Sequence, residues 1–116
     1  MAGTYQELHL SEEVSATSET CQSFVPASGK DVFIHFFAGE SEAGDDTSVR
    51  LVWNFEGSPE ECVWTIDGSA TMPFKYKIDS TDVDGIKKLG LCLTNNTNAA
   101  HFMSGHVDIW VKDPPS

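Results

Sequence analysis

Residues 52–68 read VWNFEGSPEECVWTIDG, in which the pattern Val-Trp-x-apolar-acid-Gly occurs twice, eleven residues apart. Gly and Pro are favoured in turns, so residues 57–60 are expected to reverse the chain and make the segment a β-hairpin. A loop of these four residues would place Trp53 opposite Trp64 on adjacent strands. Because side chains alternate across a strand, both tryptophans would share one face with four other apolar side chains: Leu51, Phe55, Cys62 and Ile66.

The other face of this hairpin is mostly polar and includes Arg50 and Thr65. One apolar and one polar face are typical of an antiparallel pair that is buried on one side only. A stacking platform for a sugar would need its aromatic rings on the polar face instead. We therefore predict that Trp53, Trp64 and Cys62 lie in a hydrophobic core.

The rest of the chain repeats this pattern of short β-rich runs between Gly, Ser, Asp, Asn and Pro, without helical periodicity. Residues 12–29 are rich in Ser and Thr and are expected to form a loop with room for one short strand. Residues 38–47 are expected to form an acidic loop. Strands are expected at residues 5–11, 31–37, 48–56, 61–66, 74–78, 86–93 and 99–112, the last with a break at Ser104 and Gly105.

These seven or eight strands predict an all-β fold, a single antiparallel β-sandwich of the jelly-roll type. A chain of 116 residues favours one domain. Within it, residues 30–116 are expected to form the sandwich core. Residues 1–29 are expected to form an N-terminal segment that packs on this core or is exchanged with another copy.

The charge balance argues against two classes of partner. The 18 acidic and 7 basic residues give a net charge of −11, whereas nucleic-acid binding depends on clustered Lys and Arg, and an anionic membrane would repel such a chain. No stretch approaches the roughly 18 apolar residues of a membrane-spanning helix. Residues 1–13 lack the basic and apolar regions of a secretory signal, so none is expected.

The cysteines and histidines show no local metal-binding or redox motif. Cys21, Cys62 and Cys92 are odd in number and lack CxxC spacing, which favours free thiols in a reducing cytoplasm over the alternative of one disulfide and one spare thiol. The four histidines, at positions 9, 35, 101 and 106, show neither i, i+4 nor HxH spacing. We therefore expect no metal site and no cofactor.

Other chemical motifs are also missing. Residues 79–85, DSTDVDG, lack the spacing of a calcium-binding loop and are expected to form a solvated turn. No G-x-S-x-G or similar catalytic motif is present, so we expect no enzyme activity. A Ser-His-Asp arrangement that assembles only in three dimensions stays open at this point.

Some aromatic residues fall on faces that the sandwich interior does not cover. In residues 31–37, DVFIHFF, apolar side chains lie on both faces of the expected strand, and near the end of the chain Trp110 falls on a polar face. Aromatic side chains on outer faces are enriched at protein interfaces and in carbohydrate sites. The candidate interface or ligand residues are therefore Phe33, His35, Phe37, His106 and Trp110.

Three stretches carry a resemblance to a known class of proteins: RLVWNFEG (residues 50–57), KKLGLCLTNN (87–96) and SGHVDIWV (104–111). Together they resemble small accessory β-sandwich proteins of bacteriophage virions, over roughly residues 30–112. Such proteins decorate heads or tails, usually as oligomers. The resemblance implies self-association and contact with other virion proteins, after synthesis in the host cytoplasm, but it carries over no site residues.

The resemblance and the chain's own pattern lead to one expectation, a non-enzymatic structural protein of a virion that forms homo-oligomers. The alternative is a carbohydrate-binding module that uses outer-face aromatic residues such as Trp110. A calcium-dependent binding module and an enzyme are less favoured.

Overall fold

The computed structural model describes residues 3–26, 29–43, 46–57, 59–72, 76–80 and 87–112. These residues form strands joined by turns, and none of them belongs to a helix that could cross a lipid bilayer. The strands are β1 (Gly3–Val14), β2 (Ser18–Phe24), β3 (Asp31–Ser41), β4 (Thr47–Trp53), β5 (Glu61–Asp67), β6 (Ala70–Met72), β7 (Tyr76–Ser80), β8 (Leu89–Asn95) and β9 (His101–Lys112).

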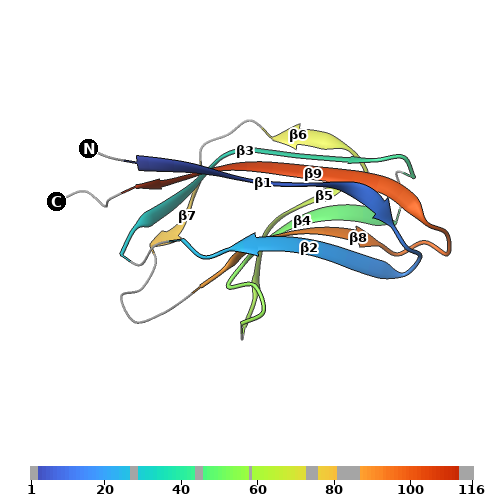
Figure 1. The fold of residues 1–116 in the computed structure, drawn as a ribbon, viewed down its shortest axis with the longest axis horizontal. Coiled ribbons are helices and arrows are strands. Elements are labelled where there is room, and N and C mark those ends of the chain that lie inside the picture. Colours follow the sequence, from blue (N-terminus) through green and yellow to red (C-terminus); the bar gives the residue numbers. More distant parts are fainter. Residues whose placement is uncertain are drawn as a thin grey trace.

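The strands form two antiparallel sheets that face each other (Figure 1). Sheet A has the order β1-β9-β3, and both β6 and β7 pair with the free edge of β3. Sheet B has the order β2-β8-β4-β5. Because β6 and β7 share one edge position, each sheet has four strand positions. The predicted all-β sandwich is confirmed.

The order of pairing identifies the sandwich as a jelly roll. β1 pairs with β9, β2 with β8, β3 with β7 and β6, and β4 with β5. The first half of the chain therefore pairs with the second half in reverse order, as in a long hairpin that is then rolled into two sheets. β1 and β2, which lie within residues 1–29, occupy one edge of each sheet.

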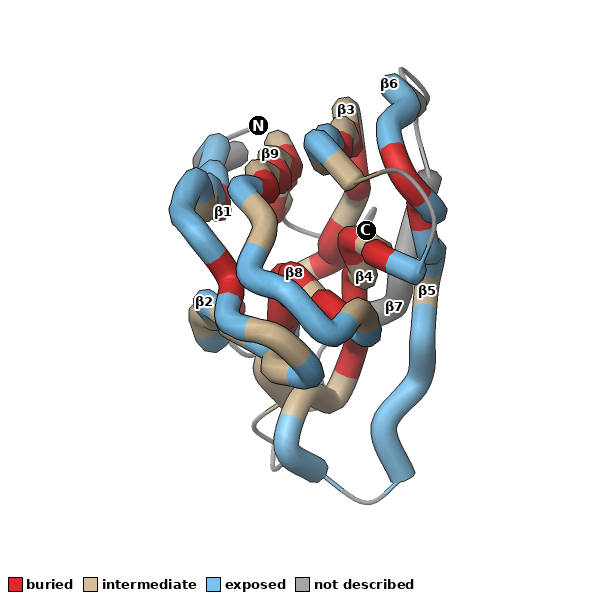
Figure 2. The backbone as a smooth tube through the Cα atoms, turned by 90° about the vertical axis from the view of Figure 1, so that its right-hand side faces the viewer, coloured by how far each residue is buried: buried red, intermediate tan, exposed pale blue. Residues whose placement is uncertain are grey.

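The core lies between the sheets (Figure 2). Buried positions alternate regularly with partly exposed ones along β9, whereas β8 is buried along almost its whole length. Full burial of each large apolar side chain contributes about 1.5–3 kcal/mol. Gly39 and Gly105, paired across β3 and β9, let the sheets approach closely, because a Cβ at either position would lie 2.8 Å from a methyl carbon of Val49. The core residues are Leu8, Val14, Val32, Ile34, Phe37, Val49, Leu51, Trp53, Ile66, Leu89, Leu91, Leu93, Met103, Val107, Ile109 and Val111.

The hairpin of β4 and β5 exists, but its predicted register is wrong. A register shift between Leu51 and Val52 places Trp64 opposite Leu51, and Trp53 pairs with Glu61. Trp53 is buried, as predicted, whereas Trp64 is 43% exposed and Cys62 is exposed. The register shift places Cys62 opposite Val52, on the outer face of the sheet. Trp64 lies on β5, the edge strand of sheet B, which the opposite sheet covers only in part.

Phe55 also departs from its predicted place on the apolar face of the hairpin. The strand ends at Trp53, and the next residues turn, with positive φ angles at Asn54 (59°) and Glu56 (64°). Phe55 instead lies over Gly90, where an added Cβ would come within 2.6 Å of its ring. Gly90 pairs with Val52, so this contact lies on the outer face of sheet B.

The cysteine prediction is also wrong. Cys21 and Cys92 are joined by a disulfide, and only Cys62 is free among the three. The two partners lie directly opposite each other in the register of β2 and β8, with their Cα atoms 4.1 Å apart. The sequence does not indicate this pair, because no local pattern shows that residues 18–24 lie beside residues 89–95.

The remaining differences concern the ends of strands. β3 continues to Ser41, into the expected acidic loop, and β9 runs without a break through Ser104 and Gly105. The strand expected at residues 74–78 corresponds to β7, and β6 is an additional short strand. The turn at residues 79–85 lies mostly outside the described residues.

Candidate functional site

The outer face of sheet A carries most of the candidate residues. The register of β1 and β9 pairs Tyr5 with Trp110, Glu7 with Asp108, and His9 with His106. These pairs alternate with inward-facing residues such as Leu8 and Val107, so they all point away from the core. They form two adjoining groups, which we call the aromatic cluster (Tyr5, Phe33, His35 and Trp110) and the His106 cluster (Glu7, His9, His106 and Asp108).

The aromatic cluster is centred on Trp110. The Tyr5 ring stacks on it, with centroids 5.7 Å apart and planes 7° from parallel. His35 meets both rings edge-on, at 5.3 Å from Trp110 and 5.6 Å from Tyr5. Phe33, the cross-strand partner of Trp110, lies 6.3 Å from it in a tilted arrangement. Tyr5 is 64% exposed and forms the open side of the cluster.

The ammonium group of Lys112 borders the aromatic cluster. The Nζ atom of Lys112 lies 4.8 Å from the centroid of Trp110 and 5.0 Å from that of Phe33. Both distances are within the range of cation–π attraction, which adds about 0.5–1 kcal/mol at an exposed site. The basic end of β9 therefore stabilises the arrangement of the rings.

Phe37 does not belong to this surface, although the sequence pattern placed it there. A register shift between Ile34 and Phe36 in the pairing with β9 leaves an extra residue, His35, in β3. Such a bulge reverses the alternation beyond it, so Phe36 points outward and Phe37 is fully buried. The Nε2 atom of His35 is buried and has no hydrogen-bond partner among the described residues.

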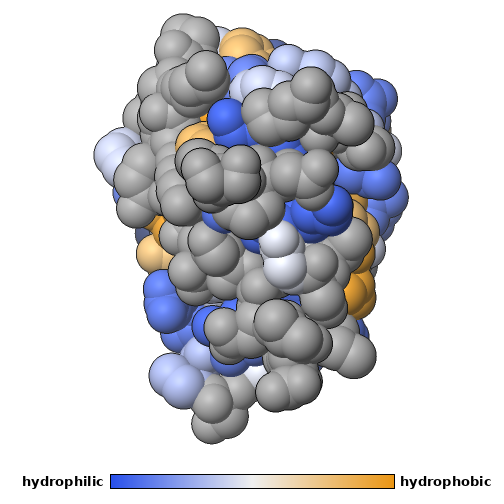
Figure 3. Space-filling view, turned by 90° about the vertical axis from the view of Figure 1, so that its left-hand side faces the viewer, coloured by the Kyte–Doolittle hydropathy of each residue, from blue (hydrophilic) through white to orange (hydrophobic). Residues whose placement is uncertain are grey.

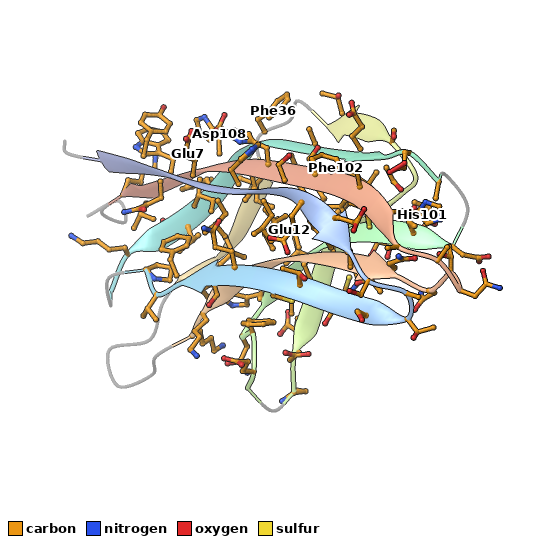
Figure 4. All side chains as sticks on the ribbon, turned by 45° about the vertical axis from the view of Figure 1, so that its right-hand side comes forward. Glu7, Glu12, Phe36, His101, Phe102 and Asp108 are labelled. Carbon is orange, nitrogen blue, oxygen red and sulfur yellow. A yellow bond between two sulfur atoms is a disulfide. The ribbon has the colours of Figure 1, made fainter. Side chains whose placement is uncertain are left out.

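The His106 cluster lies next to the aromatic cluster, toward the end of β1 and the start of β9. Nε2 of His106 lies 2.8 Å from Oδ1 of Asp108 and 4.0 Å from Oε2 of Glu7. The His9 ring lies 5.5 Å from the His106 ring, and the Phe36 ring lies 6.1 Å from it. Figure 4 shows Glu7 and Asp108 together on the outer side of sheet A, with Phe36 beside them.

A shallow pocket of about 160 Å³ adjoins this cluster. His9 and His106 line one part of it, and Glu40, Thr71 and Ser104 line the rest together with backbone at Gly39 and Gly105. The pocket joins polar side chains from β1, β3, β6 and β9, which meet only in the folded chain.

A separate polar network lies on the outer face of sheet B. Nη2 of Arg50 and the Thr94 hydroxyl each donate a hydrogen bond of 2.6 Å to Oε2 of Glu19. Partial burial alone would raise the pKa of Glu19, but these two hydrogen bonds and the charge of Arg50 outweigh it and hold the pKa below its usual value. Since the three residues bridge β2, β8 and β4, the network ties sheet B together.

Of the five residues that the sequence singled out, the structure places Phe33, His35, His106 and Trp110 on one outer face. It also adds Tyr5, Glu7, His9 and Asp108, which the sequence did not single out. The alternation of Leu8 and Leu10 in β1 already indicates that the odd-numbered residues point outward. Their partners could not be foreseen, because β1 and β9 lie at opposite ends of the chain.

Comparisons with known proteins support the assignment of the fold but not of a specific function. No protein-family model matches the chain, and no curated protein sequence matches it. The crystal structure of the Yersinia pseudotuberculosis-derived mitogen is similar, with a TM-score of 0.56 and 13% identity over 96% of this chain and 88% of that chain.

A second similar structure is a chain of the Sulfolobus Turreted Icosahedral Virus, with a TM-score of 0.59 and 15% identity. The match covers 100% of this chain and 32% of the viral chain, so this protein spans about a third of that chain's length. At such identities only the fold is shared, and one fold serves many functions. The chain is thus an antiparallel β-sandwich that resembles both a component of a virus and a bacterial mitogen.

Proposed function

We propose that this protein is a non-enzymatic structural component of a virion that self-associates through the outer face of sheet A. The observation that carries the proposal is the aromatic cluster, in which Tyr5 and Trp110 stack on a sheet face that no other part of the described chain covers. Aromatic side chains that are exposed together are typical of protein interfaces. The jelly-roll fold, shared with a chain of a virus structure, supports a place in a particle.

A second copy of this chain is the partner for the aromatic cluster that requires the fewest assumptions. Soluble homo-oligomers are usually closed and symmetric, so the same patch can serve both subunits. Each subunit carries a net charge of −11, and two such chains repel each other. The contact must therefore be apolar at its centre, at Tyr5 and Trp110, and acidic residues such as Glu7 belong at its rim, where salt screens them.

The apolar surface of the described residues is not continuous in every view. In Figure 3, the apolar areas that can be seen lie apart from one another, with hydrophilic residues among the described surface between them. An interface centred on a few aromatic residues is consistent with this surface, because a few residues usually supply most of the binding energy.

Light scattering across protein and salt concentrations tests the proposal. The wild type should be oligomeric at tens of micromolar, and added salt should leave the oligomer unchanged or strengthen it. Replacing Tyr5 by Ser, or Trp110 by Glu, should weaken association by at least about tenfold, or about 1.4 kcal/mol.

Phe102→Ser is the matched control for Tyr5→Ser. Phe102 is 50% exposed on the same face but lies near the start of β9, whereas Trp110 lies near its end (Figure 4). Eight residues separate it from Trp110, which corresponds to about 26 Å along a strand. Association should survive this change. A wild type that is strictly monomeric at tens of micromolar would end the proposal.

A carbohydrate-binding module is the second candidate, and we propose Tyr5 instead of Trp110 as the ring on which a sugar would stack. The Trp110 ring already contacts Tyr5, His35 and Lys112, whereas Tyr5 is mostly exposed, with Glu7 on the same face of the same strand. Stacking of a sugar on Tyr5 would change the fluorescence of the neighbouring Trp110. A monomeric wild type whose emission responds to saccharides, with the response lost in Tyr5→Ser, would favour this candidate.

A further inference from the structure

We infer that Glu7, His106 and Asp108 form a binding site for one zinc ion, with His9 as a fourth ligand. The inference rests on the His106 cluster and is independent of the proposed self-association. The spacing of histidines and acidic residues along the sequence does not indicate this site, because its ligands come from two strands about a hundred residues apart in the chain.

The three inner ligand atoms already lie close together. Nε2 of His106 and one carboxylate oxygen each of Glu7 and Asp108 all lie within 4.8 Å of one another. Ligands bound to zinc at about 2.0–2.1 Å in a tetrahedron are separated by about 3.3 Å. The observed separations of 2.8 Å for His106 to Asp108 and 4.0 Å for His106 to Glu7 lie on either side of that value, so small side-chain movements would complete the geometry.

His9 is placed to supply a second imidazole. It lies directly opposite His106 in the register of β1 and β9, and the two rings are 5.5 Å apart. Its ring nitrogens are not among the atoms within 4.8 Å, so His9 would have to rotate to reach the ion. The His9 side chain is exposed, as such a rotation requires.

The ligand types favour zinc over other divalent ions. Imidazole nitrogen combined with carboxylate oxygen suits zinc, whereas calcium and magnesium prefer oxygen ligands alone. The two carboxylates supply the negative charge, and the ring of Phe36 lies against His106 and helps to fix its orientation. In the absence of metal, His106 and Asp108 hydrogen-bond to each other, and an ion would replace the proton that they share.

A second group of potential ligands does not compete in the oxidised protein. Glu19, Cys21 and Cys92 also lie close together, but both sulfur atoms belong to the disulfide, so neither is a thiolate. The free thiol of Cys62 is exposed and could bind zinc by itself. The measurement therefore uses untagged protein with Cys62→Ser and no reducing agent.

Calorimetric titration of this protein with zinc chloride should give one ion per chain. His106→Ala should lower the affinity by at least about tenfold. Asp108→Asn keeps the shape of the side chain but removes its charge, and it should also weaken binding. His101→Ala is the matched control, because His101 is the first residue of β9, five positions before His106 (Figure 4), and its loss should leave zinc binding unchanged.

Two spectroscopic measurements locate the ion independently of affinity. Cobalt in place of zinc should give the strong visible absorption of a four-coordinate site, and nitrogen NMR should show zinc-dependent shifts of the His106 ring without shifts of His101. No binding at 100 μM zinc would overturn the inference. So would equal affinities of wild type and His106→Ala, or an equal loss in His101→Ala. Melting curves of each variant establish that it is folded.

Discussion

Cys21 of β2 lies directly opposite Cys92 of β8, and a disulfide joins them across the outer face of sheet B. The bond links residues 71 positions apart, so it restricts the unfolded chain strongly. Loss of such a bond typically costs about 2–4 kcal/mol. We predict that Cys21→Ser lowers the free energy of unfolding by this amount in urea titrations. Cys62→Ser is the control and should be nearly neutral, and an equal loss in both variants would contradict the prediction.

The neighbours Phe36 and Phe37 should respond in opposite ways to truncation. Phe37 is fully buried in the core, so Phe37→Ala should cost about 3–5 kcal/mol of unfolding free energy. Phe36 is only partly buried on the outer face, and Phe36→Ala should cost less than about 1 kcal/mol. Thermal and urea unfolding of the two variants provide the comparison. Equal losses would mean that the bulge at His35 is absent.

Asn95 is a buried residue on which two turns depend. Its Nδ2 donates to the carbonyl oxygens of Val14 and Ala99, both at 2.9 Å, and its Oδ1 accepts from the backbone and hydroxyl of Thr97. Asn95→Ala would leave buried backbone groups without partners, at about 1–3 kcal/mol each. Asn96→Ala, at the exposed neighbour, should change stability by less than about 0.5 kcal/mol in the same unfolding assay.

The network of Glu19, Arg50 and Thr94 predicts a dependence of stability on pH. The pKa of Glu19 is lower in the folded chain than its ordinary value of 4.5. The ionised group therefore stabilises the fold above that value, and the contribution disappears as the pH falls through the lowered pKa. Because Glu19 is more than a third exposed, solvent keeps the effect below about 1 kcal/mol.

Glu19→Gln isolates this contribution from those of the other acidic residues. The difference in unfolding free energy between wild type and variant should be present at pH 6–7 and should shrink below about pH 4.5. A difference that stays constant down to pH 3 would show that the charge of Glu19 does not contribute.

The fold class followed from alternation, but the register did not. Counting every second residue identifies a half-buried strand, and it placed Trp110 of β9 on the face that points away from the core. One extra residue at a bulge exchanges the inward and outward positions beyond it. The exchange cannot be recognised in a strand with apolar side chains on both faces, such as residues 31–37. The sequence did hold a signal, because strict alternation from Ile34 would have placed Glu40 in the core. The bulge between Ile34 and Phe36 places the Glu40 side chain on the exposed side instead.

The candidate surface was predictable only in part, for a related reason. The outward direction of Trp110 and His106 follows from their own strand, since Val107, Ile109 and Val111 are apolar. Their contacts with Tyr5 and Glu7 depend on the pairing of β1 with β9, and no local pattern encodes which distant strands pair. Spacing rules for metal ligands likewise describe ligands within one segment, so they do not apply to side chains that two neighbouring strands bring together.

The central position of β9 in sheet A has a consequence for the way the protein is made. β9 is the last of the described strands to leave the ribosome, yet it separates β1 from β3 and pairs with both. A nascent chain that ends before His101 therefore contains β1 without β9, its partner in sheet A among the described strands, and the apolar residues of β1 lack part of their cover. Folding must wait for residues 101–112 to emerge, so a ribosome that stalls before them holds an open chain that is prone to aggregate.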